Sequence, residues 1–306
     1  MAALQPPSSL GGKSMIGILA GIAGAAALAA LSVANYRHFM GKPQTLSEPG
    51  YAVEVRPFSC ENGNRTIRGE LLLPKGKPGK LPTVILCHGL GSRYTLSKTL
   101  AGVTLARSGF ACCVFDFYGG NTKSISGGTM LDMSIFTEQS DLNAVTDAVK
   151  KMGFVDLENL FLFGESQGGL VSAITASERE DDYRAMILYY PAFTLPVEAN
   201  EKYHVASDIP DTVKWGRTTL GRTYYEPLLG WNVYDHLAGY HKNVLILHGD
   251  ADQIIDVSCA HKAAEIYEHA ELHILPGQPH GFDGKGKMQA VRMAYEFLLK
   301  NMKGRA

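Results

Sequence analysis

A pentapeptide in the middle of the chain, Gly164-Glu165-Ser166-Gln167-Gly168, places a serine between two glycines. The residues before it, "LFLF", are apolar or aromatic, and the residues after it have helical spacing. A serine on a sharp turn from a strand into a helix has a strained backbone, and glycines on both sides prevent steric clashes there. The pattern predicts that Ser166 presents its hydroxyl as a nucleophile.

A serine hydroxyl becomes an effective nucleophile when a base takes its proton and an acid orients that base. The base that we predict is His280, because it lies in a loop rich in Gly and Pro, "PGQPHGF", that follows a late strand. The loop "HGDADQIID" supplies the candidate acids. We choose Asp252, because Asp250 suits the turn after the strand and Asp256 suits the start of the next helix. Asp250 and Asp256 remain alternatives.

Attack on a carbonyl group also requires hydrogen-bond donors for the oxygen that becomes negatively charged. One donor is expected to be the backbone N–H of Gln167, which follows the serine and begins a helix. The second is expected from Leu90, in the tetrapeptide "HGLG" that begins at His88. The alternative for this loop is a tight exit from a strand. His88 and His248 end strands, and we expect both to be hydrogen-bonded packing residues.

The elements that must position these residues alternate along the chain. Segments 51–58 and 65–74 alternate apolar and polar residues, which predicts a half-exposed antiparallel pair. Continuously apolar runs predict strands covered on both faces, at 81–89, 110–117, 159–164, 185–192 and 243–250. Helical spacing occurs at 95–107, 136–151, 167–178, 258–269 and 286–302. The alternation predicts an α/β fold with a doubly wound, mostly parallel sheet, whose functional residues cluster at the carboxyl ends of the strands.

One interval, residues 193–240, is too long for an ordinary connection between two strands. It is rich in aromatic residues: Trp215, Trp231, Tyr203, Tyr224, Tyr225 and Tyr234. We predict that it forms an inserted lid, and that most of its aromatic side chains form the small core that an insertion needs. A capped, largely apolar pocket suits a neutral ester with an apolar or aromatic acyl group.

The amino-terminal part of the chain contains a segment without charged residues, at 15–36, that is long enough to cross a bilayer as a helix. We interpret residues 1–14 as a tail, 15–36 as a transmembrane anchor, 37–50 as a linker and 51–306 as the globular domain. A cleaved secretory signal, which would release the protein, is one alternative for 15–36, and a buried soluble helix is another.

Charge and cysteine content narrow the possible functions. The chain has 306 residues, with 29 Lys and Arg against 30 Asp and Glu, so it has no basic field for nucleic acid, and we expect none to bind. No cysteine or histidine cluster has the spacing of a metal site, and we expect no metal and no cofactor. The cysteines, which we interpret as core-filling thiols, are Cys60, Cys87, Cys112, Cys113 and Cys259.

Six motifs together resemble the α/β-hydrolase superfamily and, within it, the bacterial cinnamoyl (feruloyl) esterases and dienelactone-hydrolase-like serine esterases. The resemblance covers residues 51–302 and rests on "CHGLGS", "DFYGGNTKS", "GESQGG", "TTLGRTYY", "HGDADQIID" and "PHGF". Two positions differ from the family pattern, since Gly120 and Glu165 stand where histidine is usual.

The resemblance implies the α/β-hydrolase fold and assigns roles to individual residues. It implies a catalytic triad of Ser166, Asp252 and His280, with Leu90 and Gln167 as oxyanion donors. It also implies that the insertion covers the acyl pocket.

By the same resemblance, Tyr224 matches a lid tyrosine that contacts the phenolic end of the substrate. The predicted function is a serine carboxylic-ester hydrolase that acts through an acyl-enzyme on small esters with an apolar or aromatic acyl group, hydroxycinnamate esters included. A serine peptidase of the acyl-aminopeptidase type is one alternative, because it shares the fold and the serine turn. A non-catalytic, membrane-tethered binding protein on the same scaffold is another.

Overall fold

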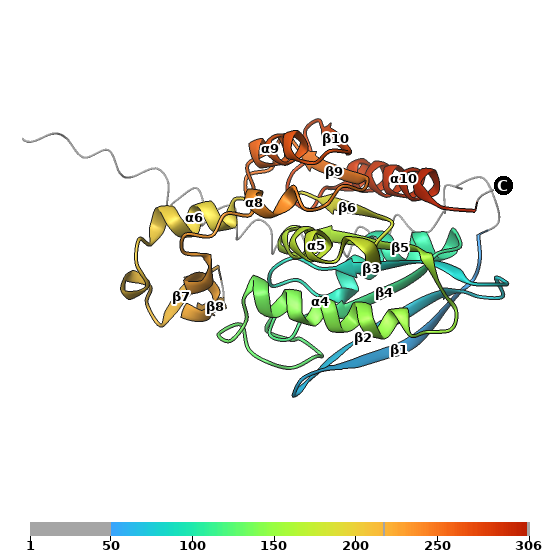
Figure 1. Ribbon diagram of the computed structural model, residues 1–306, viewed down its shortest axis with the longest axis horizontal. Helices are drawn as coiled ribbons and strands as arrows, with labels where there is room; N and C mark the ends of the chain where they lie inside the picture. The colour runs from blue at the N-terminus through green and yellow to red at the C-terminus, as the bar shows by residue number, and fades with distance from the viewer. Residues whose placement is uncertain (1–49, 217, 305–306) are drawn as a thin grey trace, which may run out of the picture. The chain divides into compact units, whose positions relative to one another are not determined.

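The computed structural model describes residues 50–216 and 218–304, which contain one eight-stranded sheet (Figure 1). In spatial order its strands are β1 (Val53–Asn62), β2 (Arg65–Pro74), β4 (Ala111–Asp116), β3 (Leu81–Cys87), β5 (Val155–Glu165), β6 (Ala185–Tyr189), β9 (Val244–Gly249) and β10 (Ala270–Leu275). β1 pairs antiparallel with β2, and β2 pairs antiparallel with β4. The other pairs are parallel, so the carboxyl ends of six strands lie at one edge of the sheet.

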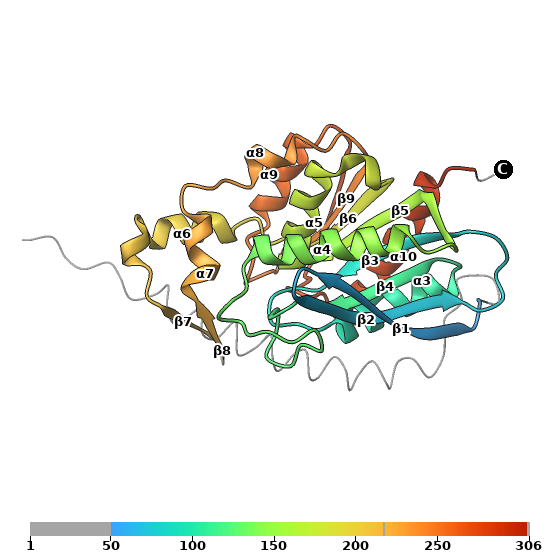
Figure 2. The same cartoon turned by 60° about the horizontal axis from the view of Figure 1, so that its bottom comes forward.

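Helices cover both faces of this sheet (Figures 1 and 2). One face packs against α4 (Ile135–Lys150), α5 (Gln167–Glu178), α8 (Tyr234–Leu237) and α9 (Ser258–Ile266). The other face packs against α2 (Tyr94–Ser97), the π-helical turn Lys98–Gly102, α3 (Val103–Arg107) and α10 (Gly284–Asn301). The sheet is therefore the middle layer of three, as expected of a doubly wound fold.

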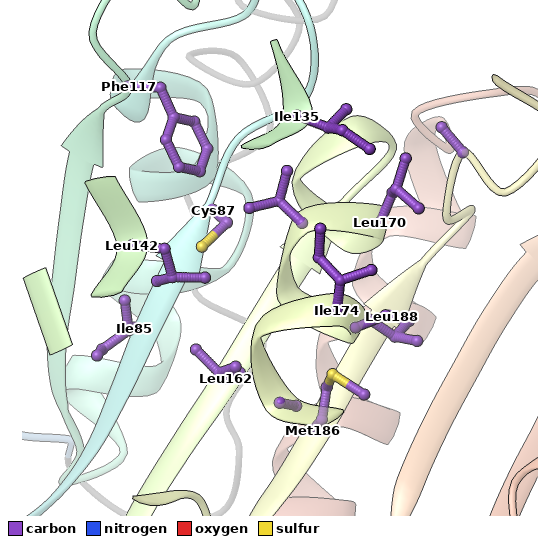
Figure 3. Packing of buried hydrophobic residues seen from close by; sticks show 14 of the residues in the cluster. Ile85, Cys87, Phe117, Ile135, Leu142, Leu162, Leu170, Ile174, Met186 and Leu188 are labelled. Atoms are coloured by element: carbon purple, nitrogen blue, oxygen red, sulfur yellow. The ribbon is translucent and has the colours of Figure 1, made fainter. Parts of the chain in front are cut away.

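The two faces hold separate hydrophobic clusters because successive side chains of a strand point in opposite directions. In β3, Ile85 and Cys87 belong to the cluster beneath α4 and α5, whereas Val84 and Leu86 belong to the cluster beneath α10. Figure 3 shows part of the first cluster, where side chains of α5 pack between those of neighbouring strands. Four of the five cysteines are buried, which confirms the interpretation as core-filling thiols for those four, and Cys60 is partly buried at the edge of the first cluster.

A reciprocal cap fixes the start of α4. The Ser134 hydroxyl accepts a hydrogen bond from the Thr137 backbone N–H, and the Thr137 hydroxyl accepts one from the Ser134 N–H. Such a capping box satisfies two donors that a helix start otherwise leaves unpaired. The next residue, Glu138, lies in the first turn of α4 and is 1% exposed.

The chain between β6 and β9 holds several short elements. They are α6 (Leu195–Lys202), a 3₁₀ turn at Ala206–Asp208, β7 (Thr212–Trp215), β8 (Thr218–Gly221), α7 (Arg222–Tyr225) and a second 3₁₀ turn at Glu226–Leu228, followed by α8. β7 and β8 form an antiparallel ribbon of their own, apart from the main sheet. Tyr203, Ile209 and Val213 form a small separate cluster there.

The predicted α/β-hydrolase fold, with its mostly parallel sheet, is confirmed, and the predicted helices match α2–α3, α4, α5, α9 and α10 to within a few residues. α9 is shorter than predicted, because its last turn gives way at Tyr267 to an extended backbone. The anchor predicted at 15–36, with the flanking tail and linker, lies outside the described residues. Within 50–216 and 218–304, no helix is both long and apolar enough to cross a membrane.

Candidate active site

Ser166 lies on the turn between β5 and α5, with a φ of 53° and a ψ of −120°. Few residues other than glycine adopt a positive φ, and the surroundings must enforce it. The Ser166 N–H donates to the Tyr189 carbonyl at 2.9 Å, and the Ser166 carbonyl accepts from the Ala192 N–H at 3.0 Å. These bonds tie the turn to the end of β6 and leave the serine side chain partly exposed.

The flanking glycines are required by close backbone approaches. A Cβ atom at Gly164 would overlap the carbonyl oxygen of Gly168, and a Cβ atom at Gly168 would overlap the carbonyl oxygens of Cys87 and His88. The predicted steric reason for the glycines is thus present, although the colliding atoms come from α5 and the end of β3 rather than from Ser166 alone.

His280 reaches Ser166 from the loop after β10. Its Nε2 lies 3.0 Å from Ser166 Oγ, and its Nδ1 lies 2.7 Å from Asp252 Oδ2. Because a carboxylate can only accept, Nδ1 carries the proton, and Nε2 is free to accept from the serine hydroxyl. The Tyr190 ring packs against the imidazole, with 4.6 Å between the ring centroids.

Asp252 is held from both of its oxygens. Oδ1 accepts from the backbone N–H groups of Ile254 and Ile255, each at 2.9 Å. Oδ2 accepts the hydrogen bond from His280 Nδ1 and lies 3.2 Å from Nε2 of the buried His248. Burial acts to raise the pKa of Asp252, but the hydrogen bonds from His248 and His280 outweigh it and hold that pKa well below its usual range.

The two alternative acids lie elsewhere. Asp250 accepts from the backbone N–H of Gly277 at 2.5 Å and joins two loops. Asp256 accepts from the Ser258 N–H at 2.8 Å, at the start of α9. These are the turn and cap positions that the sequence favoured for them, and Asp252 is the acid that contacts His280.

The loop of Leu90 passes close to the turn that holds Ser166 and Gln167. A Cβ atom at Gly89 would lie 3.0 Å from Ser166 Cβ, so the loop that contains Leu90 passes directly against the serine. Gly91 donates its N–H to the Gly120 carbonyl at 2.9 Å, which fixes the far end of this loop. Within the described residues, the N–H groups of Leu90 and Gln167 donate to no protein acceptor. Both are therefore available to a substrate oxygen.

His88 has a packing role, as expected. It is fully buried, its Nδ1 lies 2.8 Å from the Gly89 carbonyl, and its Nε2 accepts from the Phe117 N–H at 3.2 Å. Burial lowers the pKa of His88, so the ring is neutral and supports the loop that precedes Leu90.

Tyr224 lies at the back of the site and is 2% exposed. Its hydroxyl donates to Oε1 of Gln167 at 2.6 Å, and Nε2 of Gln167 donates to Oε2 of Glu138 at 2.8 Å. The tyrosine that the resemblance assigns to the substrate thus contacts the residue that follows the serine.

An aromatic ring from the β7–β8 ribbon borders the oxyanion loop. Trp215 lies so close to Gly91 that a Cβ atom there would be 3.0 Å from Cζ3 of the indole. Gly91 also has a φ of 68°, a conformation that favours glycine. The insertion therefore contributes a wall to the site.

Sequence reasoning did not assign Glu138, Glu165 or Trp215 to the site and treated His248 as packing. Strand position alone does not reveal that His248 shares the carboxylate of Asp252. Burial raises the pKa of Glu165, which is 3% exposed, to about 7, against the smaller effects of Ser97, Lys287 and Tyr190. Such a carboxyl group has no sequence signature, because its burial depends on packing between distant elements.

The arrangement can perform nucleophilic acyl transfer. A hydroxyl, an imidazole and a carboxylate form a line of hydrogen bonds, and among the described residues the backbone N–H groups of Leu90 and Gln167 have no protein acceptor.

Comparison with known proteins agrees with this chemistry. Residues 99–305 match the prolyl oligopeptidase family. The protein Est1E from Butyrivibrio proteoclasticus, in a structure with ferulic acid bound, is 26% identical over 80% of this chain and 98% of that chain, with a TM-score of 0.73. A dienelactone hydrolase from Anabaena variabilis (17% identity, TM-score 0.57) covers 82% of this chain and 99% of its own.

A monoacylglycerol lipase from Paleococcus ferrophilus shares the fold too, with 17% identity and a TM-score of 0.58 over 82% of this chain and 100% of that chain. The match at 99–305 covers more than half of this chain and includes the serine turn, the loop of Asp252 and the loop of His280. The chain therefore belongs to the prolyl oligopeptidase family and is a serine hydrolase with the α/β-hydrolase fold.

Proposed function

We propose that this chain is a carboxylic-ester hydrolase in which Ser166 is the nucleophile, His280 the base and Asp252 the residue that orients the base. The observation that carries the proposal is the hydrogen-bonded line from Ser166 Oγ through His280 to Asp252, at 3.0 and 2.7 Å. The substrates are small esters with an apolar or aromatic acyl group.

The reaction has two halves. Ser166 Oγ attacks the ester carbonyl carbon while His280 Nε2 takes the hydroxyl proton, and the N–H groups of Leu90 and Gln167 bind the resulting oxyanion. When the C–O bond to the alcohol breaks, His280 gives its proton to the leaving oxygen. Water then attacks the acyl-enzyme with His280 as base, which releases the acid and restores Ser166.

Two observations support an ester with an apolar or aromatic acyl group. Est1E, in a structure with ferulic acid bound, matches 80% of this chain over 98% of its own length. The indole of Trp215 borders the oxyanion loop, where the acyl group of a substrate would begin. An aromatic wall favours an apolar partner, because it offers dispersion contacts and no charge.

The test compares the purified protein with its Ser166→Ala variant on p-nitrophenyl acetate, p-nitrophenyl butyrate and methyl ferulate. We expect the variant to lose activity by a factor of roughly 10⁴ or more, with an unchanged circular dichroism spectrum. Wild-type protein, and not the variant, should be labelled by a fluorophosphonate probe. Activity that persists in the variant would refute the assignment, and an unlabelled, inactive wild type would favour a non-catalytic binding protein.

The family match favours one second candidate, a serine peptidase of the acyl-aminopeptidase type. An ester and an amide with the same acyl group separate the two functions. We expect hydrolysis of an N-acetyl-amino-acid p-nitrophenyl ester and little turnover of the matching p-nitroanilide. Efficient cleavage of the p-nitroanilide would support the peptidase instead.

We also propose that residues 15–36 anchor the chain to a membrane. The full chain should remain in the membrane pellet after alkaline carbonate extraction, and a chain that starts at residue 41 should be soluble and active. Recovery of a shortened, secreted form would support the cleaved signal, and carbonate-soluble full chain would support a soluble helix.

A further inference from the structure

A buried chain of hydrogen bonds links three elements behind the serine turn. Gln167, the first residue of α5, is fully buried and is bonded at both ends of its amide. Its Oε1 accepts from the Tyr224 hydroxyl of α7 at 2.6 Å, and its Nε2 donates to Glu138 Oε2 of α4 at 2.8 Å. The amide thus joins the insertion to the body of the enzyme.

The place of Tyr224 depends on a close backbone approach. Gly221, three residues earlier, ends β8, and a Cβ atom there would overlap the Leu131 carbonyl oxygen. Its N–H lies 3.4 Å from the Met130 carbonyl. Because β8 lies against the loop that contains Met130 and Leu131, α7 begins where Tyr224 can reach Gln167.

Glu138 contacts the Gln167 side chain and lies close to Gly120. Oε2 accepts from the side chain of Gln167, whereas Oε1 has no partner among the described residues. Oε1 would lie 3.1 Å from a Cβ atom at Gly120, whose carbonyl accepts from Gly91 in the oxyanion loop. The glycine that replaces the family's usual histidine therefore leaves room for this carboxyl group, which contacts Gln167 directly and reaches the loop of Leu90 through Gly120 and Gly91.

The two hydrogen bonds of the Gln167 side chain also stabilise the strained backbone of Ser166. Its positive φ is strained, and strain of this kind persists only where neighbouring contacts enforce it. The N–H of Gln167 follows Ser166 directly, so a relaxation of the turn changes the direction of that N–H. Two hydrogen bonds on a fully buried side chain oppose such a relaxation.

We infer that Gln167 couples the insertion to the oxyanion site, and that Tyr224 and Glu138 are positioning residues that act through it. The inference rests on the proposed ester hydrolysis. It assigns Tyr224 to the machinery behind the serine rather than to contact with the substrate.

Glu138 adds a charge effect, because an anion beside the developing oxyanion would oppose catalysis. Burial raises the pKa of Glu138 to about 8, against the opposing hydrogen bond from Gln167, and Asp141 raises it further. The carboxyl group is therefore mostly neutral at pH 7 and becomes charged above pH 8.

The protonation states of the other titratable groups around Glu138 do not change between pH 7 and 9. Burial raises the pKa of Tyr224 far above its usual value and that of Cys87 to about 12, so both stay neutral. His88 is neutral because burial lowers its pKa, and Asp116 lies behind it, 3.7 Å from Nε2. Burial raises the pKa of Asp141, on the same helix, only to about 6, so Asp141 is already charged.

The first experiment is a mutant cycle on kcat. Tyr224→Phe should lower kcat by about fivefold to tenfold with little change in KM, as expected for one lost hydrogen bond. The same substitution in a Gln167→Ala background should have no further effect. The matched control is Tyr225→Phe on the same short helix. The Tyr225 hydroxyl makes no hydrogen bond within the described part of the chain, so its loss should leave kcat unchanged.

The second experiment is the pH profile of kcat for wild type and Glu138→Gln. The introduced glutamine side chain can still accept the hydrogen bond from Gln167 but carries no charge at any pH. Wild-type kcat should fall by about fivefold to tenfold between pH 7 and 9, and that of Glu138→Gln should not. The comparison is repeated in Glu165→Gln protein, with and without Glu138→Gln, because burial raises the pKa of Glu165 to about 7.

Three results would overturn the inference. The first is equal kcat for Tyr224→Phe and Tyr225→Phe, and the second is a fivefold to tenfold loss of kcat when Tyr224→Phe is added to Gln167→Ala. The third is the same decline of kcat at alkaline pH in Glu138→Gln as in wild type. A change confined to KM and to phenolic esters would return Tyr224 to the substrate pocket. Loss of the proposed function is distinguishable, since an active Ser166→Ala variant would contradict the ester hydrolase itself and not the coupling.

Discussion

The fully buried His248 lies with its Nε2 3.2 Å from Oδ2 of Asp252, the oxygen that also accepts from the imidazole facing the nucleophile. Nε2 of His248 lies 3.1 Å from the Ile255 carbonyl as well. Because both neighbours are acceptors, Nε2 carries the proton of this ring. The single N–H of His248 thus faces both the Ile255 carbonyl and the oxygen of Asp252 that accepts from His280, so His248 supports this carboxylate from the buried side.

We expect His248→Phe, which keeps a ring of similar size and removes the donor, to lower kcat by about tenfold or more. A hydrogen bond to a charged group contributes roughly 1.5–3 kcal/mol, and the free energy of unfolding should fall by a similar amount. Steady-state kinetics and urea unfolding measure the two effects. His241→Ala is the control, because His241 is an exposed partner of Glu180 and its loss should change neither quantity. Equal kcat for both variants would remove His248 from the support of Asp252.

Glu165 should make the stability of the protein fall with rising pH. Its carboxyl group has a pKa of about 7 when folded, because of burial, against roughly 4.3 in an unfolded chain. Between these values the unfolded state releases the proton and the folded state keeps it, so stability is highest below pH 4 and decreases up to about pH 7. Glu165→Gln lacks this effect.

Urea unfolding of both proteins at pH 5 and pH 8 measures the difference. The stability of Glu165→Gln relative to wild type should increase by roughly 2–3 kcal/mol over this interval, since each pKa unit is worth about 1.4 kcal/mol. Glu138 titrates in the same direction but is present in both proteins and cancels. Parallel pH dependences for the two proteins would show that Glu165 is not held neutral by the fold.

The steric requirement at the serine turn can be tested at Gly168. A methyl group there would overlap the carbonyl oxygens of Cys87 and His88, which belong to the backbone and cannot rotate away. Gly168→Ala should therefore lower the free energy of unfolding by roughly 1–3 kcal/mol or more, and lower kcat with it. Gly153→Ala is the matched control, because a Cβ atom at Gly153 has no neighbour within 4 Å. Comparable stability for the two variants would mean that the turn can move to accept a side chain.

The sequence was sufficient for a mostly parallel sheet and for the segments that form its strands, because strands leave local patterns of apolar residues, whereas their spatial order was not predicted. The continuous apolar run of β9 and the alternation of β1 are visible without any partner. Ser166 and His280 were also identifiable, since each occurs in a loop whose glycines constrain the backbone. These signals depend on residues that are neighbours in the chain.

What the sequence could not supply are contacts between distant elements. Glu138 reads as an ordinary acidic residue in the first turn of a helix, a position that favours acids. Its role beside Gln167 exists only because α4 packs against α5 and because Gly120 leaves room there. Tyr224 could be placed on the lid by its motif, whereas the partner of its hydroxyl follows from the way that β8 lies on the loop at Leu131.

Trp215 should set the preference of the enzyme for the acyl group. Its indole lies against Gly91, in the loop whose Gly89 passes close to Ser166. We therefore expect an acyl chain bound at the serine to extend toward this ring. We expect Trp215→Ala to lower kcat/KM for methyl ferulate by about tenfold, since an aromatic pair contributes roughly 0.5–1.5 kcal/mol beyond the area that it buries. Hydrolysis of p-nitrophenyl acetate, whose acyl group is too short to reach the ring, should change by less than about twofold.

The control for this substitution is Trp231→Ala, in the same insertion. Trp231 packs against Phe136 and stacks on His236, with centroid distances of 5.4 and 4.9 Å, so its removal should lower stability and leave the ratio of the two activities unchanged. An equal loss of both activities in Trp215→Ala would mean that the indole holds the oxyanion loop in place instead of contacting the acyl group. Because the two substrates share the serine and the oxyanion donors, their ratio isolates the contribution of the wall from that of the catalytic groups.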